Sequence, residues 1–220
     1  MKKKHPSIEH PNPSLVIATA NPKKGAEMLR ILQKLLPEWH LLTLKDFTPL
    51  PEPRETGDTY DANAKIKAHY YCERLNLMCL ADDAGLEIDA LGGKPGVQSK
   101  RFGGESKAFS DKISMILDLL KNTLESERTA RFQCSVALAI PQNESKNVPI
   151  CKLYLFRASC EGKIASSPRG TRGFGYDPIF LPSGSDKTFA EMSPEEKDAV
   201  SHRGKVLRQV AEWLSRLTLS

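Results

Sequence analysis

The chain has 220 residues, of which 40% are hydrophobic and 27% are charged, and its net charge is +5 at pH 7. This length can bury one good-sized core or two small ones, and no apolar run approaches the roughly 20 residues of a membrane-spanning helix. The small net charge does not indicate nucleic acid as the main partner. Five cysteines without a C-x-x-C pair, and a basic opening with no apolar segment behind it, predict reduced thiols in a cytoplasmic protein without cysteine-bound zinc.

The first half of the chain is predicted to alternate strands and helices. Residues 1–13 should form a flexible basic arm before a single domain over residues 14–220. The spacing and the number of apolar residues predict strands at 15–20, 39–44 and 78–91, and the last of these could be one strand or two. Helices are expected at 22–36 and 59–75, and loops at 46–58 and 92–104.

The second half carries the longest predicted strands. Residues 130–140 and 149–164 alternate well enough to form a long pair, and helices are expected over 106–121 and from residue 194 onward. A glycine- and proline-rich loop is expected over 167–185, between the strand that ends at residue 164 and the helix that begins at residue 194. Because long neighbouring strands favour antiparallel pairing, the whole reads as an α/β protein with a mixed sheet.

The segment ATANPKK, residues 18–24, is a candidate phosphate site. Asn21 can cap a helix that has Pro22 at its first position, where free N–H groups and the helix dipole attract anions. Lys23 and Lys24 lie on the same turn, although the Walker A pattern is missing. Taken alone, the segment favours an ordinary capped helix with solvated lysines.

The segment 55–68 is a candidate metal and phosphate site. Glu55 lies at the end of the proline-rich loop, and Lys65 and Lys67 follow on a helix. Taken alone, the segment is better explained by a loop followed by a solvated helix face.

The stretch ADDAGLEIDALGGKPGVQSKRFGG, residues 81–104, carries two adjacent carboxylates at a strand end. The strand pleat should turn Asp82 and Asp83 to opposite faces, so that one serves a site and the other has a structural role. Mg²⁺ takes one or two carboxylates and fills its other positions with water and phosphate oxygens. Ser99, Lys100 and Arg101 in the following loop fit either a phosphate contact or a dimer surface.

The segment 169–180 is a candidate base-binding site. Phe174 and Tyr176 offer aromatic faces between glycines, and Asp177 offers an acceptor pair. A turn anchored by aromatic residues in the core explains the same pattern equally well.

The segment 195–205 contributes the donors Lys197, His202 and Arg203 at the start of a helix or at a break within one. His202 alone would more often be a surface histidine. No protease, esterase or dinucleotide motif accompanies these residues.

Five segments in this order resemble the inosine triphosphate pyrophosphatases, from about residue 15 to the C-terminus. They are ATANPKKGAE, ETGDTYDANAKIKA, the stretch 81–104, GFGYDPIF and TFAEMSPEEKDAVSHRGKVL. The resemblance implies an elongated mixed sheet with flanking helices in two lobes around a substrate cleft. It also implies a cytoplasmic homodimer that uses Mg²⁺ to cleave ITP, dITP and XTP to the monophosphate and pyrophosphate and so cleans the nucleotide pool.

The resemblance also implies residue roles. Asp83, with Lys24 and Lys67, would be catalytic, and Glu55 and Asp83 would hold the metal. Substrate-binding positions would be Thr19, Ala20, Asn21, Pro22, Lys23, Lys24, Ala84, Phe174, Gly175, Tyr176, Asp177, Lys197, His202 and Arg203. Thr19, Asn21 and Lys24 would hold the triphosphate. The positions from Phe174 to Arg203 would bind the base and ribose.

Two positions depart from the family pattern. Ala84 replaces a serine, which removes a hydroxyl expected near the substrate. Ala62 replaces a glutamate of an E-N-A motif, and Asp61 is a poor substitute because successive helical positions differ in direction by about 100°.

The expected reaction is attack of water on the α-phosphorus with pyrophosphate leaving, which depends on charge neutralisation and positioning. Donors such as His202 and Arg203 would bind the 6-oxo group of hypoxanthine or xanthine and disfavour the 6-amino group of adenine. Guanine also has a 6-oxo group, so excluding it would require a donor that penalises its 2-amino group.

Three alternatives stay open from the sequence. The first is a pyrophosphatase for other modified nucleotides. The second is a nucleotide sensor with weak or lost catalysis, suggested by Ala62 and Ala84. The third is a nucleic-acid-binding protein that uses the basic arm, and the small net charge of the body argues against it.

Overall fold

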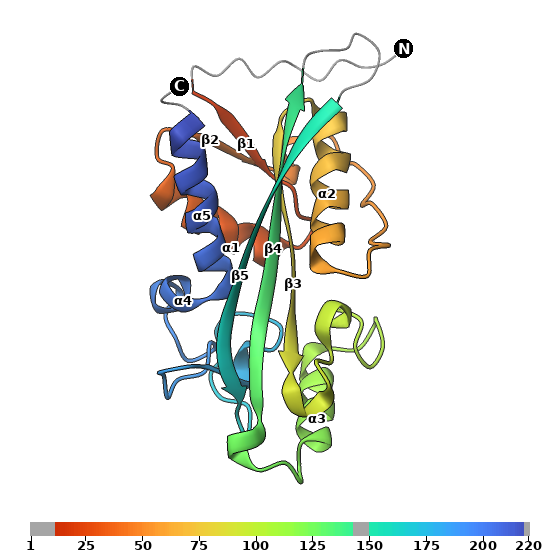
Figure 1. The fold of residues 1–220 in the computed structure, drawn as a ribbon, viewed down its shortest axis with the longest axis vertical. Coiled ribbons are helices and arrows are strands. Elements are labelled where there is room, and N and C mark those ends of the chain that lie inside the picture. Colours follow the sequence, from red (N-terminus) through yellow and green to blue (C-terminus); the bar gives the residue numbers. More distant parts are fainter. Residues whose placement is uncertain (1–11, 143–149, 218–220) are drawn as a thin grey trace. The chain divides into compact units, whose positions relative to one another are not determined.

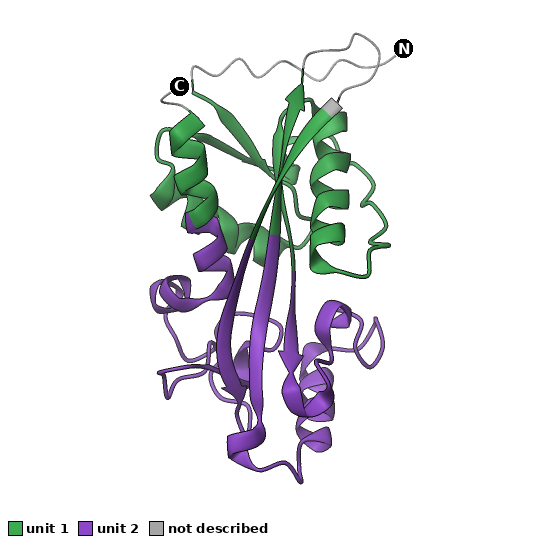
Figure 2. Cartoon of the chain, in the orientation of Figure 1, with its two compact units in different colours: residues 1–83, 136–156, 209–220 green, residues 84–135, 157–208 purple. Residues whose placement is uncertain are grey.

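A computed structural model describes residues 12–142 and 150–217. The basic arm predicted for residues 1–13 therefore lies almost entirely outside the described residues. The chain divides into two compact units. Unit 1 comprises residues 1–83, 136–156 and 209–220, and unit 2 comprises residues 84–135 and 157–208 (Figure 2).

The described strands form one mixed sheet in the order β2-β1-β3-β4-β5-β6 (Figure 1). Their bounds are β1 Ser14–Ile17, β2 His40–Thr43, β3 Met78–Ile88, β4 Thr129–Gln142, β5 Ile150–Ile164 and β6 Phe180–Pro182. β1 is parallel to both β2 and β3, whereas β6 is antiparallel to β5. The predicted α/β class with a mixed sheet is confirmed, and β3 is one continuous strand.

Unit 1 contains the parallel strands, the helices α1 (Pro22–Leu35) and α2 (Tyr60–Leu75), and residues 209–217 of α5 (His202–Leu217). Thr59 caps α2 through its hydroxyl, and the left-handed Asn76 ends the helix. The buried residues of α2 recur every three to four positions, as a core-facing helix requires. It packs into a core of small and medium side chains from β1, β3, β4 and β5.

Unit 2 has a separate and more aromatic core. It is built around α3 (Phe109–Leu119), whose Ile113 and Ile116 are buried against Phe132 of β4 and Phe180 of β6. β6 is a correction to the predicted loop over 167–185. Its three residues are all buried, and their pairing with β5 satisfies backbone groups that a buried loop would leave unpaired.

Two helices, rather than one, follow residue 193. α4 (Pro194–Val200) ends before Ser201, and α5 (His202–Leu217) begins directly after it. The buried face of α5 is formed by Val206, Leu207, Val210, Ala211 and Leu214. Leu217 at its last position is 42% exposed, since the helix ends there.

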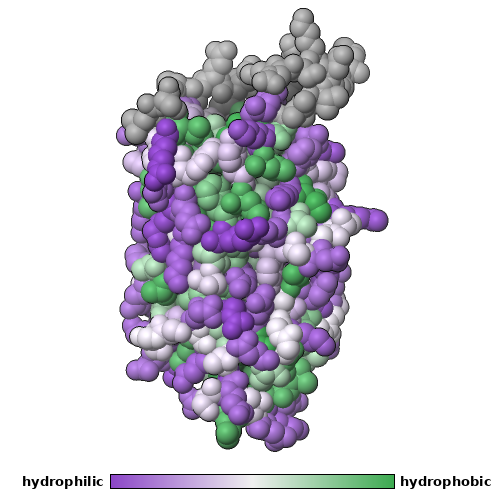
Figure 3. Space-filling model, viewed as in Figure 1, coloured by the Kyte–Doolittle hydropathy of each residue, from purple (hydrophilic) through white to green (hydrophobic). Residues whose placement is uncertain are grey.

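Hydrophilic side chains are spread over the face of the molecule seen in Figure 3, with apolar patches between them. Among the described residues, no helix is long and apolar enough to cross a membrane.

Candidate active site

The segment 18–24 leads from β1 into α1, and its first helical turn is fully capped. The Asn21 side-chain oxygen accepts the backbone N–H groups of Lys23 at 3.0 Å and Lys24 at 3.2 Å. The N–H of Gly25 donates to the Asn21 carbonyl at 2.9 Å, and Pro22 has no N–H. The capping prediction is confirmed, but the expectation of free N–H groups is wrong. An anion at this turn would rely on side chains and on the helix dipole.

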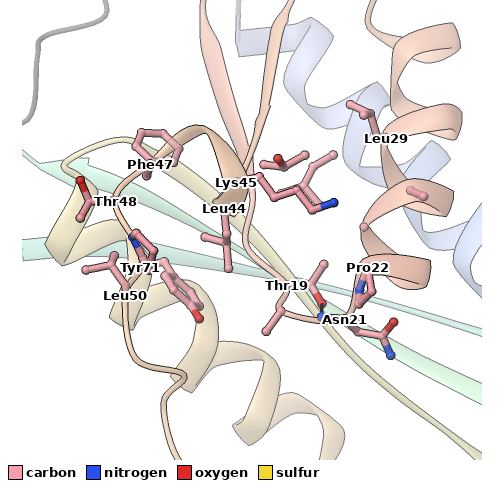
Figure 4. A pocket seen from close by; sticks show the side chains of 16 residues that line it. Thr19, Asn21, Pro22, Leu29, Leu44, Lys45, Phe47, Thr48, Leu50 and Tyr71 are labelled. Carbon is pink, nitrogen blue, oxygen red and sulfur yellow. Dashed lines mark hydrogen bonds between the residues drawn. The ribbon is translucent and has the colours of Figure 1, made fainter.

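A cavity of about 620 Å³ within unit 1 borders this segment (Figure 4). Residues 19–22 form part of its wall. The remaining wall is mostly apolar and includes Leu29, Leu44, Phe47, Leu50 and Tyr71. Because the carboxylates of β3 do not line it, the cavity is distinct from the charged cluster described next.

The charged cluster of unit 1 forms at Asp82 and Asp83 of β3. Asp82 Oδ2 pairs with Lys24 Nζ of α1 at 3.2 Å. Asp83 Oδ1 pairs with Lys67 Nζ of α2 at 3.4 Å. The neighbouring carboxylates thus turn to different helices, as the strand pleat predicts. Lys67 Nζ also donates to Glu55 Oε1 at 2.8 Å, so one ammonium joins both predicted metal ligands.

Asn63 of α2 forms hydrogen bonds both to Asp83 and to the loop that contains Glu55. Its amide nitrogen donates to Asp83 Oδ2 at 3.2 Å, while its amide oxygen accepts the N–H of Gly57 at 2.9 Å. A Cβ at Gly57 would lie 2.5 Å from the Ala62 Cβ and 2.8 Å from the Asn63 oxygen, so only glycine fits there. Asn63 is fully buried, and both ends of its amide have fixed partners.

The cluster gathers acidic and basic side chains in a largely buried place. Glu55, Asp82 and Asp83 contribute three carboxylates, and Lys24 and Lys67 contribute two ammonium groups. Burial raises the pKa of Asp83, and Lys67 and Lys24 offset this only in part. Burial would lower the pKa of Lys67, but the combined attraction of Asp83, Asp82 and Glu55 outweighs it and raises that pKa.

The candidate site residues of unit 2 are organised by Asp177. Its Oδ2 accepts Lys197 Nζ at 2.7 Å, with both side chains buried, and also the N–H of Phe174 at 2.8 Å. A Cβ at Gly173 would lie 2.0 Å from the same oxygen, so a side chain there would displace the carboxylate. Asp177 therefore fixes the loop that presents Phe174.

Two cations lie over the half-buried ring of Phe174. Lys197 Nζ lies 4.9 Å and Arg203 Cζ 5.8 Å from the ring centroid. Both distances are in the range of a cation–π interaction. The left-handed backbone of Gly175, with φ of 66°, makes the turn that follows this ring.

Tyr176 is placed differently from the predicted stacking face. It is 2% exposed, its hydroxyl donates to the Ser99 carbonyl at 2.9 Å, and its ring meets Phe109 edge-on. The neighbouring carbonyl of Lys100 accepts the buried ammonium of Lys112. Tyr176 therefore anchors the turn of segment 169–180 in the core, which is the alternative that the sequence left open, and it also contacts the loop after β3.

His202 and Arg203 are positioned by the break between α4 and α5. The Ser201 hydroxyl accepts the N–H of Gly204 at 3.1 Å, which caps α5. A Cβ at Gly204 would lie 1.9 Å from the Asp198 carbonyl oxygen, so glycine permits the close approach of α4. His202 is 3% exposed and stacks on Phe132 at 4.7 Å, which makes it a core residue rather than a surface histidine.

The structure thus brings the predicted residues together in two sets. Unit 1 collects Lys24, Glu55, Lys67 and Asp83, to which Asn63 and Asp82 are added. Unit 2 collects Phe174, Asp177, Lys197, His202 and Arg203. Sequence reasoning missed Asn63, although a polar pair at positions 63 and 67 on a buried helical stripe is a usable signal.

Eight predicted positions lie outside these sets. Thr19, Ala20, Asn21 and Pro22 line the cavity, Gly175 makes a turn and Tyr176 is a buried anchor, and Lys23 and Ala84 complete the eight. Lys23 is exposed on α1, Ala20 is exposed before it, and Ala84 is half-buried at the first position of unit 2. Ala62, which stands at the glutamate position of the family pattern, lies against Gly57.

The donor set fits a magnesium ion. Glu55 and Asp83 share Lys67, and each carboxylate offers oxygen atoms of the kind that a divalent cation takes as ligands. Across residues 12–142 and 150–217, no group of three or more histidine, cysteine, aspartate or glutamate side chains is arranged to hold a metal. Glu55 and Asp83, the two carboxylates that share Lys67, match the one or two that Mg²⁺ takes in sites completed by water and substrate phosphates.

A family model and several known proteins match this chain. The Ham1 family model matches residues 15–213, so the chain belongs to the Ham1 family. The dITP/XTP pyrophosphatase of Halalkalibacterium halodurans is 44% identical over 199 residues, which cover 90% of this chain and 97% of that protein. The dITP/XTP pyrophosphatase of Bacillus subtilis is 42% identical over 199 residues, with coverage of 90% and 96%.

The fold is also that of a solved relative. The structure of a HAM1 protein from Coxiella burnetii has a TM-score of 0.77 and 39% sequence identity, and the match covers 93% of this chain and 99% of that one. The α/β class and the family resemblance predicted from five sequence segments are confirmed.

Proposed function

We propose that this protein hydrolyses ITP, dITP and XTP to the nucleoside monophosphate and pyrophosphate, and so removes deaminated purine nucleotides from the pool. The observation that carries the proposal is the buried lysine–carboxylate cluster of unit 1, in a chain more than 40% identical to dITP/XTP pyrophosphatases. Such a cluster supplies the two requirements of phosphoryl chemistry, which are cations for the triphosphate and a carboxylate for the attacking water.

Within unit 1, Glu55 and Asp83 would hold Mg²⁺, which would neutralise phosphate charge and favour attack at the α-phosphorus. Lys24 and Lys67 would exchange their carboxylate partners for phosphate oxygens, and Thr19 and Asn21 would line the approach. Asp83 would orient the water and accept its proton, a role that its raised pKa favours. Asn63 would keep the Asp83 carboxylate in one orientation.

Within unit 2, Phe174 would stack on the purine base. The Arg203 guanidinium over this ring, and His202 beside it in sequence, would supply donors to the 6-oxo group. Adenine would place an amino donor against these donors, which is unfavourable by orders of magnitude in a site built for an acceptor. Lys197 would serve indirectly, because its ammonium is committed to Asp177.

The test is a substrate panel of ITP, dITP, XTP, GTP and ATP with and without Mg²⁺, with pyrophosphate release as the readout. We expect rapid release from the three deaminated nucleotides only, and loss of turnover when EDTA removes the metal. GTP processed as fast as ITP would overturn the specificity, and full activity in EDTA would overturn the metal.

A nucleotide sensor is the second candidate, favoured by the alanines at 62 and 84. Saturable binding of ITP without pyrophosphate release would establish it in place of the enzyme. We further propose a homodimer in the cytoplasm, without nucleic acid or membrane as partner. Light scattering of the purified chain tests the oligomeric state.

A further inference from the structure

Two cysteines of unit 1 face each other in its core. The Cys151 thiol, on β5, donates to the Cys72 sulfur of α2 at 2.7 Å. A disulfide has a sulfur–sulfur distance of about 2.05 Å, so bond formation requires an approach of well under 1 Å. None of the five cysteines forms a disulfide. A third cysteine, Cys79, lies in the same core cluster as Cys72 and Cys151.

We propose that Cys72 and Cys151 are a modification site: hydrogen peroxide oxidises them to an intrachain disulfide that fastens α2 to β5 within unit 1. Their sulfurs are already in contact, and both belong to one core cluster, so the link forms without unfolding the unit. The proposal does not depend on the proposed function, because neither cysteine belongs to the charged cluster.

The burial of the two thiols sets the order of the reaction. Cys151 is 9% exposed and Cys72 is fully buried, so peroxide reaches Cys151 first. A sulfur–oxygen bond forms as the peroxide bond breaks, which gives a sulfenic acid and water. The Cys72 sulfur then displaces the sulfenic oxygen, which leaves as a second water with the Cys72 proton. Two thiols lose two electrons and two hydrogens, and peroxide becomes two water molecules.

The second step needs no access for solvent, since the attacking sulfur is already in contact. Burial raises the pKa of both thiols, so few thiolates are present at neutral pH and the oxidation is expected to be slow. The rate should therefore rise with pH over the neutral to alkaline range. Because the link joins positions 72 and 151, which are 79 residues apart (151 minus 72), it restricts the unfolded chain strongly.

The experiment treats the reduced full-length protein with hydrogen peroxide, quenches with catalase, and maps thiols by alkylation under denaturing conditions and peptide mass analysis. We expect one linked peptide pair containing Cys72 and Cys151, with Cys79, Cys134 and Cys160 still alkylated. We also expect a rise in melting temperature of several degrees that dithiothreitol reverses.

The Cys79→Ala variant is the matched control and should form the same link, whereas Cys72→Ala should form none and show no rise in melting temperature. Mapping of the wild-type protein needs no variant, so a poorly folded variant does not decide the result. A link through Cys79, a link between chains, or thiols that survive a treatment sufficient to oxidise the denatured protein would overturn the proposal.

Discussion

The two units use buried charge in opposite ways. In unit 1, Lys67 bridges Glu55 and Asp83 while Lys24 pairs with Asp82, and this cluster is the proposed site for phosphate and metal. In unit 2, the Lys197 ammonium pairs with Asp177 and lies over the ring of Phe174, whose backbone N–H donates to the same carboxylate. We expect the first arrangement to act on a bound ligand and the second to support the loop that presents Phe174. Four substitutions test this contrast.

Asp83→Asn should have the largest effect, a loss of turnover on the order of 10³-fold, because it removes the water-orienting carboxylate. The raised pKa of Asp83 means that the folded protein binds its proton more tightly than the unfolded chain. Stability therefore falls as pH rises from the unfolded pKa to the folded one, and the charged form is a cost at neutral pH. The variant should melt at a higher temperature than wild type at pH 7. A variant that is both active and less stable would contradict the assignment of Asp83.

Lys197→Met should destabilise the protein by about 3 kcal/mol or more, since it leaves the Asp177 carboxylate buried without its cation. Chemical denaturation measures this. The double variant with Asp177→Asn should recover much of the loss, provided that the new amide oxygen keeps accepting the Phe174 N–H. Equal losses of stability in the single and double variants would show that the unpaired charge of Asp177 is not the cause of the destabilisation.

Asn63→Asp should lower activity by roughly 10- to 100-fold, as changes behind a metal site typically do. The new carboxylate still accepts the Gly57 N–H but can no longer donate to Asp83. The Mg²⁺ concentration needed for half-maximal activity separates this effect from a loss of folding. Lys65→Ala on the same helix is the control, and an equal change there would remove the special role of Asn63.

Tyr176→Phe should have the smallest effect, a destabilisation of about 1 kcal/mol, because it removes one buried hydrogen bond to Ser99. If the hydroxyl serves only this loop, the KM for ITP should stay within a factor of about two or three of wild type, because no bond to substrate is lost. A large rise in KM with unchanged stability would return Tyr176 to the base-binding residues.

Local patterns predicted the elements well and their partners poorly. The Asn21 cap and the divergence of Asp82 and Asp83 follow from helix and strand geometry, and both are present. The contact of Tyr176 with Ser99 joins positions 77 apart (176 minus 99), and no local periodicity encodes such a contact. The same applies to the stacking of His202 on Phe132.

The Asn63–Gly57 bond also bears on how this sequence can change. It fixes the end of the proline-rich loop two residues after Glu55, while residues 47–50 are held at the wall of the cavity. Between these anchors, residues 51–54 are mostly exposed. Insertions or a fused tag should therefore be tolerated at residues 51–54 without displacing Glu55, which makes this short stretch the natural attachment point for a label near the charged cluster of unit 1.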